Sequence, residues 1–171
     1  ILEHCKEIFA EVMAEGMTDF EKELALHDWL IAHGAYDAQS RDNVAHKGQP
    51  NNTDPYGMLH GGYGICLGFA TTFQLLMDLA EVECITVVGA AYDSEQDHAW
   101  NMVKLDGEWY CVDVTWDNSG DSGKDVLQRQ KATHRYFNVT SQYLRDTDHQ
   151  WDYENIPEAT AETYRWEGVG K

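Results

Sequence analysis

The dipeptide Asp106-Gly107 restricts the fold of this chain more than any other local feature. It lies between two runs of strand-like composition, residues 98–105 and 108–115. Asp-Gly is a strong signal for a two-residue β-hairpin turn, because both residues tolerate the positive φ that this turn requires. The sequence therefore predicts an antiparallel hairpin in which Leu105 lies opposite Glu108.

This register places an imidazole and a carboxylate close together. Asp113 would lie opposite Trp100, and His98 would share a face with Trp100, two residues along the strand. Diagonal neighbours of this kind have Cα atoms roughly 7–8 Å apart, which allows a hydrogen bond between His98 and Asp113. A register shifted by one residue would put the two side chains on opposite faces.

A thiol lies upstream at the predicted start of a helix. Glycines 61, 62 and 64 lead to Cys66, after which apolar residues recur at helical spacing, namely Phe69, Phe73, Leu76 and Ala80. The first turn of a helix has unpaired N–H groups and a partial positive charge, which favour the thiolate. Cys66 is therefore a candidate nucleophile, and the alternative is a small buried hydrophobic residue.

The three residue types have distinct roles in nucleophilic catalysis. Cys66 would attack a carbonyl carbon, His98 would hold the proton and deliver it to the leaving amine, and Asp113 would orient the imidazole. The product of the first step would be a thioester. The backbone N–H of Cys66 is a natural oxyanion donor. A second donor stays open among three preceding tyrosines, which can equally be packing residues: Tyr36, Tyr56 and Tyr63.

Three sequence blocks also carry a family resemblance. They are G-x-C-x-G-F-A at residues 64–70, H-A-W-N at 98–101 and W-Y-x-V-D-x-T-W-D at 109–117. Together they resemble the transglutaminase-like superfamily, a papain-related group that includes transglutaminases, peptide N-glycanases and many bacterial proteins. By this resemblance Cys66, His98 and Asp113 match the catalytic residues of the family. The implied fold is α+β, a papain-like core in which the nucleophile helix packs on an antiparallel sheet.

The resemblance implies a thiol enzyme of bacterial type that acts on amide bonds of proteins or peptides. An amine acceptor would make it a transglutaminase, and water would make it a cysteine peptidase or amidase. A non-catalytic module that binds peptides is a third possibility. The resemblance also implies a location outside the cell or at its surface. Its motifs lie within about residues 20–139, and we expect residues 1–171 to form one domain.

Charge and hydropathy exclude other classes of partner. The chain has 12 Lys and Arg against 30 Asp and Glu, a formal net charge of −18. Nucleic acid phosphates would be repelled by this charge, so we expect no nucleic acid partner. Uninterrupted apolar sequence is too short to cross a bilayer, so we expect no membrane insertion. The sequence leaves the oligomeric state open.

Metal-binding patterns are weak in this sequence. Residues 117–125 are acidic, but the positions that an EF-hand reserves for glycine and glutamate hold Ser122 and Gln128. CxxC and HExxH spacings are absent from the sequence. We therefore expect neither a bound metal nor another cofactor. The three remaining cysteines are expected to be free thiols: Cys5, Cys84 and Cys111.

The flanking segments have simpler patterns. A helix is expected within residues 1–15, and another after Thr18, whose spacing to Glu21 fits a capping box. We place His27 and His33 at the helix surface or its cap, and His46 and His60 in loops without a catalytic role. Residues 37–55 form a predicted loop that could border the substrate site. Strands are expected at 84–92 and 136–139.

Overall fold

The structure, a computed structural model, describes residues 1–36, 53–92, 94, 96–118 and 133–166. Its helices are α1 (Leu2–Val12), α2 (Asp19–His33), α4 (Pro55–Gly61), α5 (Cys66–Leu79), α6 (Val114–Asp117) and α8 (Ser141–Asp146). Its strands are β1 (Ala35–Tyr36), β2 (Tyr63–Gly64), β3 (Cys84–Ala91), β4 (Gln96–Leu105), β5 (Glu108–Val112) and β6 (His149–Gln150). The molecule is α+β, as the sequence predicts.

The antiparallel sheet has the strand order β5-β4-β3-β6. Its β4–β5 hairpin has the predicted register, with Leu105 opposite Glu108 and a two-residue turn between them. Asp106 and Gly107 have φ angles of 51° and 82°, the left-handed values that this turn needs. A separate parallel pair, β1–β2, joins Tyr36 to Gly64 just before α5.

The second strand of the hairpin is shorter than predicted. We expected it to reach Thr115, but β5 ends at Val112 and the one-turn helix α6 follows. Asp113 is the N-cap of α6, and its Oδ1 accepts a hydrogen bond from the backbone N–H of Trp116 at 3.1 Å. The β-branched residues after Asp113 favour a strand, but this cap turns the chain away from the sheet.

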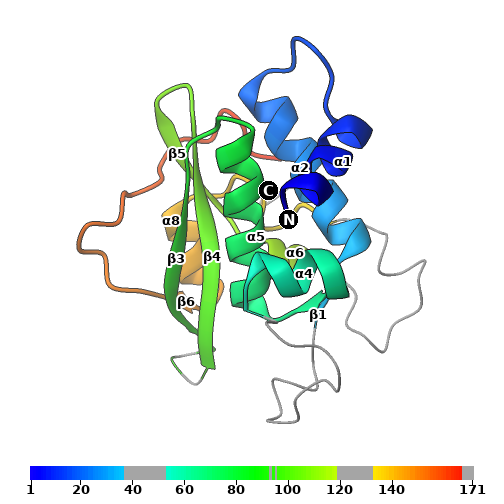
Figure 1. Cartoon of the computed structure of the whole chain (residues 1–171). Helices are drawn as coiled ribbons and strands as arrows, with labels where there is room; N and C mark the ends of the chain where they lie inside the picture. The colour runs from blue at the N-terminus through cyan, green and yellow to red at the C-terminus, as the bar shows by residue number, and fades with distance from the viewer. Residues whose placement is uncertain (37–52, 93, 95, 119–132, 167–171) are drawn as a thin grey trace.

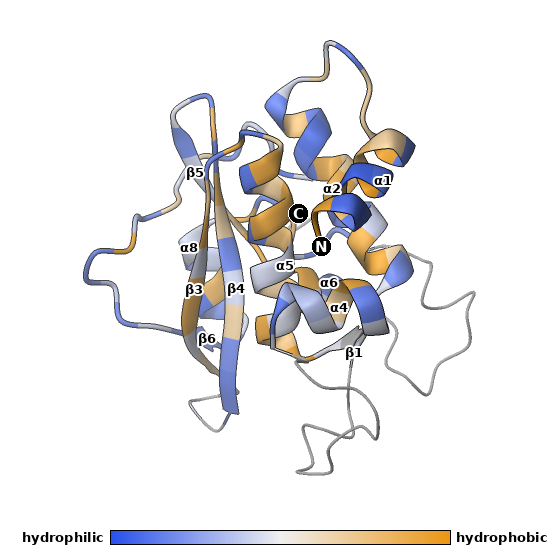
Figure 2. Cartoon of the chain, viewed as in Figure 1, coloured by the Kyte–Doolittle hydropathy of each residue, from blue (hydrophilic) through white to orange (hydrophobic). Residues whose placement is uncertain are grey.

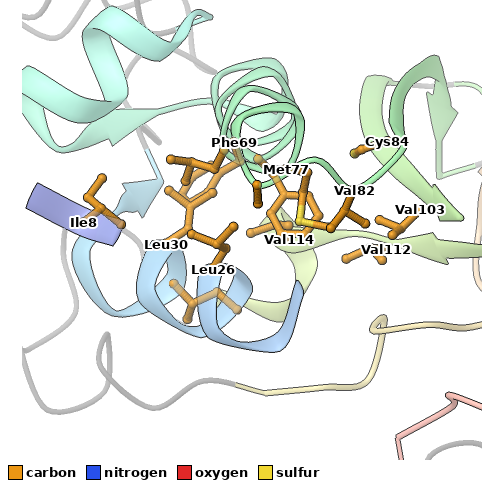
Figure 3. Close-up of a cluster of buried hydrophobic side chains, with 14 of the residues drawn as sticks. Ile8, Leu26, Leu30, Phe69, Met77, Val82, Cys84, Val103, Val112 and Val114 are labelled. Atoms are coloured by element: carbon orange, nitrogen blue, oxygen red, sulfur yellow. The ribbon is translucent and has the colours of Figure 1, made fainter. Parts of the chain in front are cut away.

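Helix α5 lies between the sheet and the α1–α2 pair (Figure 1). Figure 2 shows that much of α5 is hydrophobic, as expected for a helix covered on both sides. Side chains from all of these layers meet in the main core, which Figure 3 shows with labelled members that include Ile8, Leu26, Leu30, Phe69, Met77, Val103 and Val112. Helix α5, which begins with Cys66, is thereby held on the sheet.

The opposite face of the sheet carries a second core. Trp100 and Met102 of β4 pack there with Leu144 of α8, and residues 151–159 run along this face. The predicted strand at 136–139 is wrong, since only Val139 forms an isolated bridge, with Cys111. Thr140 caps α8, and its side chain accepts a hydrogen bond from the Tyr143 N–H. This face positions β6, which adds His149 and Gln150 to the edge of β3.

Local signals predict the N-terminal helices well. Thr18 and Glu21 form the predicted capping box at the start of α2. The segment before Cys66 differs from the expectation, because Asp54 caps a helix, α4, that begins at Pro55. All four cysteines are free and buried. Among the described helices, none has both the length and the hydropathy to span a membrane.

Candidate active site

Cys66 is the first residue of α5 and is 9% exposed. The residue before it, Ile65, caps the helix without a side-chain hydrogen bond, so the cap residue leaves the N–H groups of the first turn unpaired. Cys66 packs with Ala70 of α5 and Ala99 of β4. The thiol thus lies at the positive end of a buried helix, beside the strand that carries His98.

His98 lies between a carboxylate and a thiol. Its Nε2 is 2.7 Å from Asp113 Oδ2, and the Cys66 side chain is near enough to the imidazole to affect its protonation. Since Nε2 is engaged by Asp113, Nδ1 is the nitrogen left for Cys66. Burial lowers the pKa of His98, but the charge and hydrogen bond of Asp113, together with the nearby Cys66, outweigh it and raise the pKa to about 10.

The two faces of the sheet contribute differently to this arrangement. Asn101 of β4 donates to the Ala70 carbonyl at 2.9 Å, so α5 packs on the face of the odd-numbered residues. His98 lies on the other face, with its ring 5.8 Å from that of Trp100. Cys66, at the start of α5, and His98, near the beginning of β4, are therefore neighbours at the end of the sheet rather than across its covered face.

Asp113 is fully buried and accepts three hydrogen bonds. Its Oδ2 lies 2.7 Å from His98 Nε2 and 2.7 Å from His149 Nε2, and its Oδ1 accepts from the Trp116 backbone. Burial alone raises the pKa of Asp113. The charge of His98 and the hydrogen bonds from both histidines outweigh burial and hold that pKa well below its usual range.

His149 was not predicted from the sequence as a site residue. It lies on β6, is fully buried, and its ring is 5.4 Å from that of His98. Its Nδ1 is 3.0 Å from the Thr147 carbonyl. Residue 149 follows an acidic stretch with no motif spacing, and its contact with Asp113 depends on β6 joining the sheet, so local sequence carries little sign of it.

Aromatic rings enclose the His98–Asp113 pair. Trp116 of α6 is the central ring, with its centroid 5.2 Å from that of His98 and 4.3 Å from that of His149. Tyr92, directly after β3, lies against Trp116 with the two rings tilted and their centroids 5.4 Å apart. Such rings exclude water from the pair, and an ion pair is worth more in a less polar environment.

A second histidine–carboxylate network lies on the other side of α6. We predicted a surface position for His27, but it is fully buried. Its Nε2 is 2.9 Å from Asp117 Oδ2 and its Nδ1 is 2.8 Å from Asp28 Oδ1, which also contacts His134 Nε2 at 2.9 Å. Burial lowers the pKa of His27, but the two carboxylates outweigh it and raise the pKa to about 9. His33 is exposed, as predicted.

Two trios among the described residues have donor atoms within 4.8 Å of one another: His98, Asp113 and His149, and His27, Asp28 and His134. In each trio the carboxylate lies at hydrogen-bond distance from both imidazoles. These hydrogen bonds alone account for both arrangements. The acidic segment at 119–125, the predicted loop at 37–52 and His46 lie outside the described residues.

The second oxyanion donor stays a prediction. Tyr36 of β1 pairs with Gly64 of β2, which is two residues before Cys66. Tyr56 is half exposed on α4, where it contacts the ring of His60. His60 therefore lies on a helix rather than in the predicted loop. These positions do not select a donor, whereas the backbone N–H of Cys66 is at the start of α5 as predicted.

Comparison with curated proteins identifies relatives that are named peptidases. The chain is 34% identical to Kyphoscoliosis peptidase of Homo sapiens over 123 residues, a match that covers 64% of this chain and 18% of the relative. Kyphoscoliosis peptidase of Mus musculus is 32% identical over the same length, with the same coverage. The chain thus spans about a fifth of the length of these curated relatives.

Solved structures share the fold. A crystal structure of a TGase superposes with a TM-score of 0.54 at 20% identity, covering 72% of this chain and 32% of that chain. A candidate cysteine protease from Cytophaga hutchinsonii superposes with a TM-score of 0.51 at 19% identity, covering 66% and 37%. The model of the family described as the transglutaminase-like superfamily matches residues 6–114, which include Cys66, His98 and Asp113. The chain belongs to the transglutaminase-like superfamily.

Proposed function

We propose that this protein is a thiol-dependent acyl-transfer enzyme that acts on amide bonds of proteins or peptides through Cys66, His98 and Asp113. The observation that carries the proposal is the position of the His98 imidazole. The ring contacts a buried carboxylate and lies near a thiol at a helix N-terminus, which affects its protonation. This arrangement suits an imidazole that stores and returns a proton during attack by sulfur.

The reaction follows from the positions of the three groups. The Cys66 thiolate attacks the carbonyl carbon of an amide, and the backbone N–H of Cys66 stabilises the charge that develops on the carbonyl oxygen. The C–N bond then breaks, His98 gives its Nδ1 proton to the leaving amine, and a thioester forms. An amine or water next gives a proton to His98 and attacks the thioester, which releases the acyl product and restores the thiolate. Asp113 holds the imidazole in position throughout.

Hydrolysis is the second candidate outcome, with water as the acceptor. Two curated relatives at 34% and 32% identity are named peptidases, which favours cleavage of peptide bonds by this chain as well. The three residues serve both outcomes, because the first half-reaction is the same. What distinguishes the outcomes is whether an amine or water reaches the thioester.

One experiment tests the chemistry and separates the acceptors. The protein is incubated with glutamine-containing casein and a fluorescent primary amine, and the products are examined for incorporated amine and for new peptide termini. Cys66→Ala is the test variant. Cys5→Ala is the matched control, since Cys5 is also a buried, free thiol but lies on α1.

The outcomes are distinct. Amine incorporation that Cys66→Ala abolishes and Cys5→Ala retains supports transfer to amines. New peptide termini with the same dependence support a peptidase. If neither product forms and iodoacetamide modifies Cys66 at the rate of a free thiol, independently of His98, the chain is a non-catalytic module and the proposal is wrong.

A further inference from the structure

One oxygen of Asp113 is shared by two imidazoles. His98 Nε2 and His149 Nε2 both lie 2.7 Å from Oδ2, and the three side chains are at most 5% exposed. His98 comes from β4, whereas His149 comes from β6 at the far edge of the sheet. A carboxylate can orient one catalytic imidazole without a second imidazole beside it. Burying a second imidazole costs free energy that its hydrogen-bond partners must offset.

The partners of His149 define its protonation. Nδ1 faces the Thr147 carbonyl and Nε2 faces the Asp113 carboxylate. A carbonyl oxygen and an ionised carboxylate only accept hydrogen bonds, so each ring nitrogen of His149 must donate. An imidazole with a proton on both nitrogens is a cation. His149 therefore places a second positive charge 5.4 Å from the ring of His98.

The other groups around this pair are few among the described residues. Tyr136 lies 5.8 Å from His149 between ring centroids, and burial raises its pKa to about 12, which keeps its hydroxyl neutral. Trp100 and Trp116 contribute uncharged rings. The carboxyl of Asp117 acts on Asp113 from the other end of α6 but is paired with His27. The charged groups in contact with His149 are thus Asp113 and His98, and Cys66 lies near His98. The carboxylate of Asp148, the preceding residue, is exposed to solvent.

We propose that His149 is a positioning residue of this active site, which shares Asp113 with His98 and balances the charge of the Cys66 thiolate. The inference rests on the proposed function, because it assigns His149 a role in the same reaction. When the imidazoles of His98 and His149 are protonated and Cys66 and Asp113 are ionised, the four groups together carry no net charge. Without the charge of His149, the buried cluster would carry one excess negative charge whenever the thiolate forms.

Two consequences follow for the reaction. A nearby cation favours the thiolate form of Cys66, the nucleophile. The same cation repels the proton on His98, so His98 releases this proton more readily to the leaving amine. A general acid works best when its pKa lies near the working pH. Asp113 acting alone would raise the pKa of His98 too far above that pH for easy release of the proton.

The test substitutes His149 and follows the Cys66–His98 pair across pH. Gln in place of His149 keeps a donor towards Asp113 and removes the charge, whereas Phe fills the space and removes both. His33→Gln is the matched control, because His33 is exposed at the end of α2. The readouts are the rate of iodoacetamide alkylation of Cys66 from pH 4 to 11, kcat and KM with the casein substrate, and the thermal midpoint.

Loss of the cation should move both limbs of the alkylation profile of His149→Gln and His149→Phe to higher pH, by about one unit. In the same variants kcat at pH 7 should fall about tenfold while KM changes less than twofold. His33→Gln should match the wild type. A folded His149→Gln variant with an unshifted profile would assign His149 a structural role and overturn the proposal.

A measurement on the wild-type protein covers the case in which the variants do not fold. With ¹⁵N-labelled histidine, both ring nitrogens of His149 should show the chemical shifts of protonated nitrogen at neutral pH. An unprotonated nitrogen in His149 overturns the proposal. Alkylation and NMR do not depend on turnover, so an inactive protein with the shifted profile would contradict the proposed function and still support the role of His149 in the ionisation of Cys66.

Discussion

Asp113 and Asp117 lie at the two ends of the one-turn helix α6, and each carboxylate contacts a buried histidine from a distant part of the chain. Asp113 contacts His98 at 2.7 Å, and Asp117 contacts His27 of α2 at 2.9 Å. The N–H of Asp117 also donates to the carbonyl of Asp113 at 3.1 Å. The pair with His27 therefore fixes α6 against α2, and α6 in turn holds the carboxylate that orients His98.

Asp117→Asn should weaken both the fold and the active site. The substitution leaves the charged His27 buried beside Asp28 alone, and breaking a buried ion pair of this kind costs about 3 kcal/mol. Urea denaturation measures the loss of unfolding free energy. The transfer assay should show a lower kcat, because α6 no longer fixes Asp113.

Asp28→Asn is the matched control for this prediction. Asp28 also contacts His27, but its side chain is 41% exposed, so the substitution should cost less. An Asp117→Asn protein as stable as the wild type would show that the His27–Asp117 contact does not hold α6 in place.

The sequence predicts the parts of this fold that depend on local interactions. The hairpin register follows from Asp106-Gly107 because the turn needs two positive φ angles, and the start of α2 follows from the Thr18 capping box. The prediction that His98 meets Asp113 depends only on that register. These features involve residues that are close in sequence, where backbone sterics and capping determine the structure.

The missed features depend on contacts between distant segments. Within a helix pattern, His27 is polar and is therefore predicted to be exposed. It is buried against the equally buried carboxylate of Asp117, which is 90 residues away in the sequence. The role of His149 depends on β6 joining β3 through two residue pairs. Neither partner is recognisable from local periodicity. Both histidines are buried because their nitrogens have acceptors, which only the folded chain brings together.

Glu23 should make the protein less stable as pH rises through the neutral range. Burial raises its pKa to about 8, although a hydrogen bond from Asn138 and the charge of His27 lower it in part. In the unfolded chain the glutamate pKa is about 4.3. The stabilising contribution of the protonated group is therefore fully present below about pH 4.3 and is lost as pH rises to about 8.

Glu23→Gln keeps the shape of the side chain and cannot titrate. The unfolding free energy of the wild type minus that of Glu23→Gln should fall from pH 5 to pH 8 and then level off, as measured by urea denaturation. His27, with its pKa raised to about 9, loses its own contribution between about pH 6.5 and 9 in both proteins, so its effect largely cancels in the difference. A difference that does not change with pH would mean that Glu23 is ionised in the folded protein.

Cys66 should be the one cysteine that iodoacetamide modifies in the native protein. The other thiols are at most 5% exposed, and burial raises their pKa values, to about 12 for Cys111. Thiol alkylation needs the thiolate and access to it, and Cys66 has His98 beside it and a helix N-terminus behind it. Mass spectrometry after brief treatment should show one added group on Cys66, and four groups after denaturation.

His98→Gln is the test variant for this prediction. Without an imidazolium, the alkylation rate of Cys66 at pH 6 should fall by about tenfold or more. Equal rates in the two proteins, or native modification at Cys84 or Cys111, would contradict the pairing of Cys66 with His98.

Gly89→Ala should displace β6 and with it His149. A Cβ at this position would lie 2.2 Å from the Gln150 carbonyl oxygen and 2.8 Å from the Trp100 ring, too close for either neighbour to stay in place. Because β6 is held to β3 by two residue pairs, it is the element that moves. Overpacking of this kind costs about 1–3 kcal/mol. Val88→Ala, an exposed substitution in the same strand, should change the unfolding free energy by less than about 0.5 kcal/mol.

The informative comparison is between Gly89→Ala and His149→Gln. If the displacement of β6 carries His149 away from Asp113, both variants should move the alkylation profile of Cys66 to higher pH, although Gly89 is not part of the reacting groups. Urea denaturation of Gly89→Ala separates this effect from general instability, because partial unfolding would expose Cys66 without shifting its profile in this direction. A destabilised Gly89→Ala protein with the wild-type profile would show that His149 keeps its contact with Asp113 independently of β6 pairing.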